Sequence, residues 1–198
     1  MISQTDLDRA MSYNQYHHLL EDLLSHGKTT GPLQSEAYLN YAKLNLQRMV
    51  RLDKTLTLNL ELITALQGVK SGYTWLVLTE GWCGDAAQNL PIMAAIEKEC
   101  PNIHLRLLLR DENSGLMDQY LTGSSRSIPK LICVRTANLE EIFTWGPRPD
   151  EVQHLMLDLK AKGTPLDEKS LLIQKWYNTD KTQTLQKELA ALIVQFLL

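Results

Sequence analysis

The stretch EGWCGDAAQNLP, Glu80–Pro91, carries the strongest structural information in this 198-residue chain. An apolar, β-rich run, YTWLVLT (Tyr73–Thr79), comes shortly before it and is typical of a buried parallel strand. A helix is expected after it, from about Asp85 to Glu99. A single cysteine, Cys83, therefore stands at a strand-to-helix corner.

The segments beyond this corner predict an α/β fold with a mixed sheet of about four strands. The run IHLRLLL (103–109) follows the expected helix, so its strand should lie parallel to the first one. Two further strands, in SIPKLICV (127–134) and at 139–145, flank a tight turn and should be antiparallel. Short and long helices are expected at 116–121 and 150–160.

Helical extensions are predicted on both sides of this core. Residues 1–70 indicate one helix from Leu7 to the glycine at 27, a second capped by Ser35, and a third from Asn59 to Gln67. Residues 163–198 end in an amphipathic helix that needs an apolar partner surface, either this core or a second copy. We expect a single domain over 1–198, with its core at 71–162.

Composition and charge exclude several functional classes. The net charge of −3 gives no field that would attract a nucleic acid. The N-terminus lacks a signal-peptide pattern, and the longest apolar run, LAALIVQFLL (189–198), is only half a membrane span. Three scattered cysteines do not form a disulfide framework. We expect a cytoplasmic monomer or homodimer that binds neither nucleic acid nor membrane.

Several features of the central segment are similar, in order and spacing, to those of the thioredoxin-like superfamily. They are the start of its W-C-G-P-C motif at Trp82–Gly84, the helix-kinking Pro91, the cis-proline pair Ile128-Pro129, Arg126 and Gly146. Residues 70–162 resemble most closely the atypical bacterial members with a W-C-G-D motif. The resemblance implies a thioredoxin fold, thiol–disulfide chemistry, and a proline at 129 that lies beside the nucleophile.

The sequence departs from the family pattern at the second thiol and its base. Ala86 occupies the position of the resolving cysteine, Asp85 replaces the usual proline, and Val77 stands where thioredoxins keep a buried aspartate. The motif is therefore W-C-G-D-A. Dithiol–disulfide cycling is not expected from it.

No other cysteine can resolve a disulfide at Cys83 inside one folded chain. Cys100 lies at the far end of the same helix, roughly 25 Å away at about 1.5 Å per residue, whereas a disulfide needs Cα atoms within about 7 Å. Cys133 lies roughly 13 Å along its strand from the cis-proline end. Both are expected to be inert core thiols.

The sequence predicts monothiol chemistry at Cys83, with an external thiol that resolves the adduct. The N-terminus of the helix should lower the pKa of this thiol, while Glu80 and Asp85 should oppose that effect if they lie close. Asp85 has an alternative role as a helix cap. Trp82 is either a substrate-facing aromatic residue or part of the packing.

The candidate site consists of the catalytic Cys83 and five substrate-binding residues. These are Trp82, Gly84, Asp85, Ile128 and Pro129. Expected partners are protein or small-molecule thiols and disulfides, with no cofactor and no metal, which makes the chain a possible thiol–disulfide oxidoreductase. The alternatives are a non-catalytic thioredoxin-fold binding module, in which Cys83 is a relic, and a redox sensor.

Overall fold

The structure, a computed structural model, describes residues 2–198 and is built around one four-stranded mixed sheet. The strands, in the spatial order β2-β1-β3-β4, are β1 (Tyr73–Thr79), β2 (Ile103–Leu109), β3 (Lys130–Arg135) and β4 (Glu141–Trp145). Strands β1 and β2 are parallel, whereas β3 is antiparallel to both β1 and β4. The predicted fold class, strand number and strand directions are confirmed.

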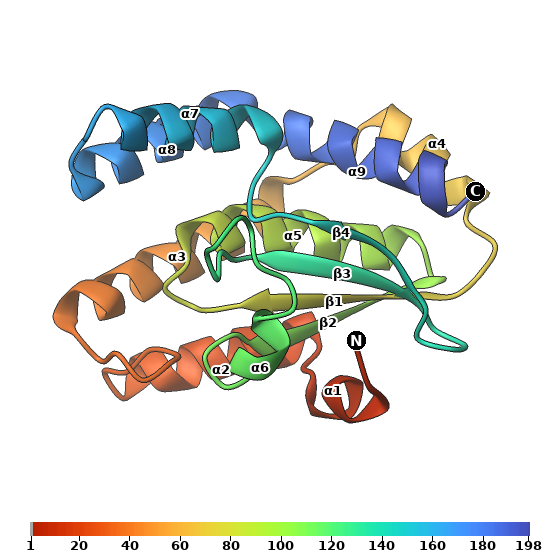
Figure 1. Ribbon diagram of the computed structural model, residues 1–198, viewed down its shortest axis with the longest axis horizontal. Helices are drawn as coiled ribbons and strands as arrows, with labels where there is room; N and C mark the ends of the chain where they lie inside the picture. The colour runs from red at the N-terminus through yellow and green to blue at the C-terminus, as the bar shows by residue number, and fades with distance from the viewer. Residues whose placement is uncertain (1) are drawn as a thin grey trace.

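Helices surround the sheet (Figure 1). They are α1 (Gln4–Arg9), α2 (Tyr13–Ser25), α3 (Glu36–Thr55), α4 (Leu60–Gly68), α5 (Gly84–Glu99), α6 (Ser114–Met117), α7 (Asp150–Ala161), α8 (Leu166–Asp180) and α9 (Gln183–Phe196). Helices α1 and α2 contact β2 at one edge of the sheet, and α9 contacts β4 at the other. Helix α5 packs between β2 and α3.

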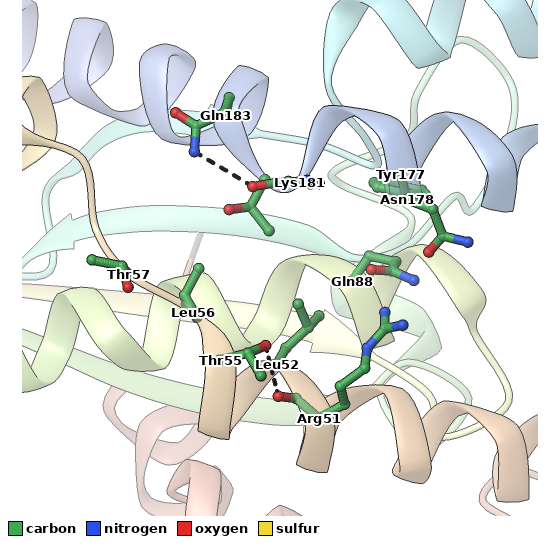
Figure 2. A pocket seen from close by; sticks show the side chains of 11 residues that line it. Arg51, Leu52, Thr55, Leu56, Thr57, Gln88, Tyr177, Asn178, Lys181 and Gln183 are labelled. Carbon is green, nitrogen blue, oxygen red and sulfur yellow. Dashed lines mark hydrogen bonds between the residues drawn. The ribbon is translucent and has the colours of Figure 1, made fainter.

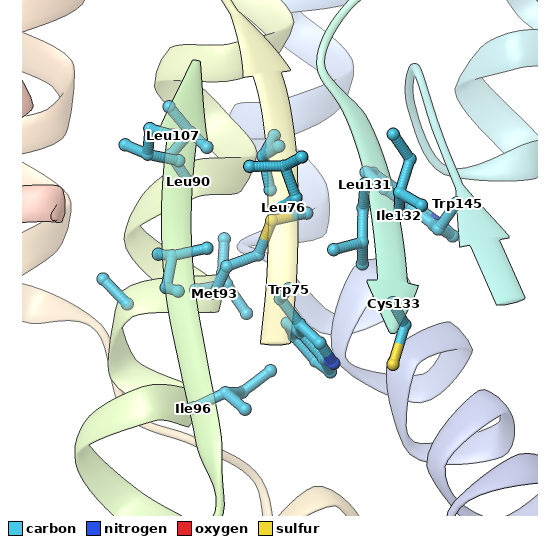
Figure 3. Close-up of a cluster of buried hydrophobic side chains, with 14 of the residues drawn as sticks. Trp75, Leu76, Leu90, Met93, Ile96, Leu107, Leu131, Ile132, Cys133 and Trp145 are labelled. Carbon is cyan, nitrogen blue, oxygen red and sulfur yellow. The ribbon is translucent and has the colours of Figure 1, made fainter. Parts of the chain in front are cut away.

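The hydrophobic core is built from the sheet and α5 together with buried side chains of α2, α4 and α9. Every residue of β1 is buried, as expected for a central strand that is covered on both faces. Trp75 on β1 and Met93 on α5 are fully buried, and Figure 3 shows them with Leu107 from β2 and Ile132 from β3 in one cluster. This packing fixes the corner between β1 and α5 that carries Cys83.

The N-terminal region differs from its prediction, because it forms two helices instead of one. Ser12 caps α2 through a capping box with Gln15, and a new helix therefore begins at this point. Met11 lies between the helices and exchanges two backbone hydrogen bonds with Leu107, both 2.8 Å long. The cap predicted at Ser35 is present. Asn59, predicted as the first residue of the third helix, is its N-cap, and α4 begins at Leu60. Helix α6 ends earlier than predicted.

The C-terminal amphipathic helix packs back on its own core. Leu185, Leu189 and Ile193 of α9 are buried, and the helix contacts α4 and β4. Helix α8 joins α9 through Lys181 and Thr182, both in the left-handed backbone region. Within residues 2–198, no helix is long and apolar enough to cross a membrane.

Candidate functional site

Cys83 lies at the N-terminus of α5, in the N-cap position. Its Sγ is 3.3 Å from the main-chain oxygen of Ile128, to which the thiol donates a hydrogen bond. The peptide bond between Ile128 and Pro129 is cis. Sequence positions 45 residues apart are thus brought into contact.

Burial dominates the acid–base behaviour of the Cys83 thiol. The residue is only 8% exposed, and burial, followed by the charge of Asp85, raises the pKa of Cys83 to about 12. The backbone N–H groups of Ala86 and Asp85 and the charge of Arg148 lower the pKa but do not offset the burial. The helix N-terminus acts in the predicted direction, yet the net shift is upward, because desolvation is the larger effect.

Asp85 does not cap α5, because its carboxylate bonds to two other parts of the chain. Oδ2 accepts hydrogen bonds from Nε and Nη2 of Arg148, at 3.0 and 2.5 Å. Oδ1 accepts a 2.9 Å bond from the Tyr177 hydroxyl on α8. Arg148 and Tyr177 were missed by the sequence analysis, since neither stands in a recognisable motif. They tie the segment before α7 and helix α8 to the Cys83 corner.

A cavity of about 730 Å³ opens beside Cys83. Trp82, Cys83, Gly84, Asp85 and Ile128 all line it, so five of the six predicted site residues meet there. Pro129 is buried and is not part of the lining. Helices α3, α7 and α8 supply much of the remaining wall. The helical extensions therefore complete the site.

Trp82 borders the cavity and also packs against its neighbours. The Tyr38 ring contacts it edge to face, with centroids 5.1 Å apart, and the Arg110 guanidinium lies 4.8 Å from its centroid. Both predicted roles, a ligand-facing aromatic residue and a packing residue, are compatible with this position. The two contacts hold the indole in one orientation.

The other cysteines are buried away from this site. The Sγ of Cys100 lies 3.8 Å from the Leu66 carbonyl oxygen, behind the end of α5. Cys133 is fully buried in β3, and burial raises the pKa of its thiol to about 12. Ala86 and Val77, at the positions of the missing thiol and base, are also buried.

Glu80 is a buried carboxyl group at the end of β1. Its Oε1 accepts a 2.9 Å hydrogen bond from the N–H of Asp111, in the turn that follows β2. Burial raises the pKa of Glu80, and the Thr30 hydroxyl and the Asp111 N–H offset this only in part. Relative to the unfolded chain, folding therefore shifts Glu80 toward its protonated form.

Glu80→Gln should change how stability depends on pH. Because the folded pKa of Glu80 is raised, its contribution to stability is largest below the unfolded pKa and is lost as pH rises through the folded value. Each unit of pKa difference corresponds to about 1.4 kcal/mol above that value. Urea unfolding between about pH 4 and pH 8 should show Glu80→Gln gaining stability over the parent as pH rises. A pH-independent difference would contradict this assignment.

Comparison with known proteins agrees with the geometry. A profile of the thioredoxin family matches residues 31–164. The chain belongs to the thioredoxin family. The match begins before residue 71 and includes α3 and α4.

Solved structures show the same fold over nearly the whole chain. The thioredoxin-family chain superposes on a Pseudomonas aeruginosa protein of unknown function with a TM-score of 0.62, at 17% identity, over 98% of this chain and 99% of that one. An HIV epitope-scaffold gives a TM-score of 0.57, also at 17% identity, over 93% and 99%. No curated protein matches the sequence.

Proposed function

We propose that this chain is a thioredoxin-fold binding protein that holds a small molecule in the cavity beside Cys83. The observation that carries the proposal is the state of the thiol. It is buried, it already donates its hydrogen to Ile128, and its pKa is raised, while a cavity of about 730 Å³ lies next to it. A buried, neutral thiol is a poor nucleophile.

The shape of the site favours a small molecule over an extended protein strand. The cavity is walled by α3 on one side and by α7 and α8 on the other. Pockets for small molecules are concave, mainly apolar and contain a few placed polar groups. Apolar and aromatic side chains, among them Tyr41, Met156 and Ile173, share this cavity with arginines.

The rate of Cys83 alkylation against pH tests the proposal. A pKa raised from 9.0 to about 12 leaves about a thousandfold fewer thiolates at neutral pH than an ordinary cysteine has. We expect iodoacetamide to modify the native protein with a midpoint far above pH 8.5. Cys83→Ala serves as the blank, and mass spectrometry of peptides separates Cys83 from Cys100 and Cys133.

Monothiol exchange is the second candidate function, favoured by the place of Cys83 at the edge of the cavity and next to Ile128. The Cys83 thiolate would attack a small-molecule disulfide, form a mixed disulfide and release the other half as a thiolate. An external thiolate would then attack the mixed disulfide, form a new disulfide with the bound half and release Cys83 as its thiolate. An alkylation midpoint below pH 8.5, with a trapped mixed disulfide, would support this candidate and overturn the binding proposal.

A further inference from the structure

The four arginines that line the cavity differ in how their charges are balanced. Three form ion pairs with carboxylates, namely Arg110 with Asp111, Arg126 with Asp118, and Arg148 with Asp85. Arg48 on α3 has no ion pair within residues 2–198. It is therefore the cation in this wall that a ligand can neutralise.

The Arg48 side chain is half-buried and held in place. Its Nη1 donates a 2.9 Å hydrogen bond to Oδ1 of the buried Asn45, whose Nδ2 in turn donates a 3.0 Å bond to the Gly81 carbonyl. Burial, followed by the charge of Arg51, lowers the pKa of Arg48. The bond to Asn45 uses one N–H of a guanidinium that carries five, so several donors remain for an acceptor.

A second source of positive potential lies at the same place. Arg48 Nη1 is 3.7 Å from the position that a Cβ on Gly84 would occupy, which puts the guanidinium beside the first residue of α5. This helix has 16 residues and no side-chain cap, so its N-terminal dipole adds to the charge of Arg48. Both features favour an anion at this point of the cavity wall.

The rest of the wall fits an apolar, planar body. Trp82, fixed between Tyr38 and Arg110, offers an aromatic surface close to Gly84. Tyr41 and side chains of α8, including Leu166 and Ile173, complete an apolar lining. A planar aromatic ring can pack against such surfaces with little loss of conformational freedom.

We propose that the ligand is a small aromatic monocarboxylate, with its carboxylate on Arg48 and its ring beside Trp82. One unpaired guanidinium matches one negative charge, and its planar fork matches the two oxygens of a carboxylate. A phosphate monoester carries up to about two charges at neutral pH and exceeds what Arg48 balances. This inference rests on the binding role proposed above and specifies its ligand class.

Calorimetric titration with 2-naphthoate, and with its neutral isostere 2-naphthamide, tests the ligand class. We expect 2-naphthoate to bind with a Kd on the order of 0.1–1 mM and 2-naphthamide about tenfold more weakly. Equal affinity for the two, or no binding of 2-naphthoate at about 10 mM, would overturn the proposal. Tighter binding of 2-naphthyl phosphate would overturn the assignment to a monocarboxylate.

Arg48→Met should weaken 2-naphthoate binding about tenfold or more and leave 2-naphthamide binding unchanged. Arg48→Lys keeps the charge without the planar fork and should lose less affinity. Arg51→Met is the matched control. Arg51 also lies on α3 but lines a different pocket, of about 490 Å³, where Figure 2 shows it with Gln88. Equal affinity in all four proteins would overturn the role of Arg48.

The two proposals can fail separately. If Cys83 is unreactive and the protein binds 2-naphthoate no more tightly than 2-naphthamide, the proposed ligand class is wrong and the binding role remains. If Cys83 is reactive with a low pKa, and the preference for 2-naphthoate depends on Arg48, the purely binding role is wrong and the Arg48 site remains.

Discussion

Arg148→Met should destabilise the protein by about 3–5 kcal/mol, because it leaves the Asp85 carboxylate buried without its cation. The two side chains are only 14% and 12% exposed, and two N–H groups of the guanidinium bond the same carboxylate oxygen. In the variant, the Tyr177 hydroxyl remains as a partner but carries no balancing charge. Urea unfolding at neutral pH measures the loss.

An exposed ion pair of the same type provides the control. Arg126 and Asp118 also form a two-bond pair, but both side chains are about half exposed. Arg126→Met should therefore cost much less stability than Arg148→Met, because water screens an exposed pair. Equal losses for the two arginine variants would show that the burial of the Asp85 pair has no energetic consequence.

A double substitution separates lost attraction from the cost of the stranded charge. Asp85→Asn in the Arg148→Met background removes the negative charge and keeps an oxygen that can accept from Tyr177. We expect it to recover a large part of the lost stability, which a double-mutant cycle would measure as a coupling between the two positions. A double variant no more stable than Arg148→Met would contradict an electrostatic origin of the loss.

Gly146→Ala should cost about 3 kcal/mol or more, because two separate penalties fall on one residue. The φ of Gly146 is +110°, a backbone conformation that residues with a side chain rarely adopt. In addition, an added Cβ would overlap the main-chain oxygen of Pro129, which cannot move without shifting β3. Thermal or urea unfolding of the variant measures the sum of both penalties.

Gly163→Ala measures the cost of a positive φ without a steric contact of the added Cβ. Gly163 also has a positive φ, of +69°, but an added Cβ would meet nothing within 4 Å. Its replacement should therefore cost only about 1 kcal/mol. Similar losses of stability at positions 146 and 163 would show that the structure adjusts to the contact between the added Cβ and Pro129 at no cost.

Much of the fold can be read from the sequence, because the informative signals are local. The apolar run at 73–79 marks a strand that is buried on both faces. The run at 103–109 marks its neighbour at the edge of the sheet, and the helix between them fixes their parallel direction. Ser35 and Asn59 cap the helices that begin after them. The W-C-G motif and Ile128-Pro129 place Cys83 beside the cis peptide bond.

The parts that the sequence does not reveal depend on contacts between distant segments. Asp85 has the local pattern of a helix cap, but Arg148 and Tyr177 compete successfully for its carboxylate. The helix N-terminus, which lowers the pKa of Cys83, is a local feature of the sequence. The burial that raises this pKa by more comes from tertiary packing. Arg48 stands in an ordinary helical pattern, and only the folded chain brings it to Gly84.

The two hydrogen bonds between Met11 and Leu107 also cover part of one edge of the sheet. Strand β2 is one of the two edge strands of the sheet, and an edge strand with unpaired backbone groups is a template for aggregation. The segment between α1 and α2 pairs with this edge at Met11 and leaves it after one residue, so it does not extend the sheet. We expect the segment around Met11 to hinder strand pairing between copies of the chain at β2, and a chain cleaved before Tyr13 would lose this protection.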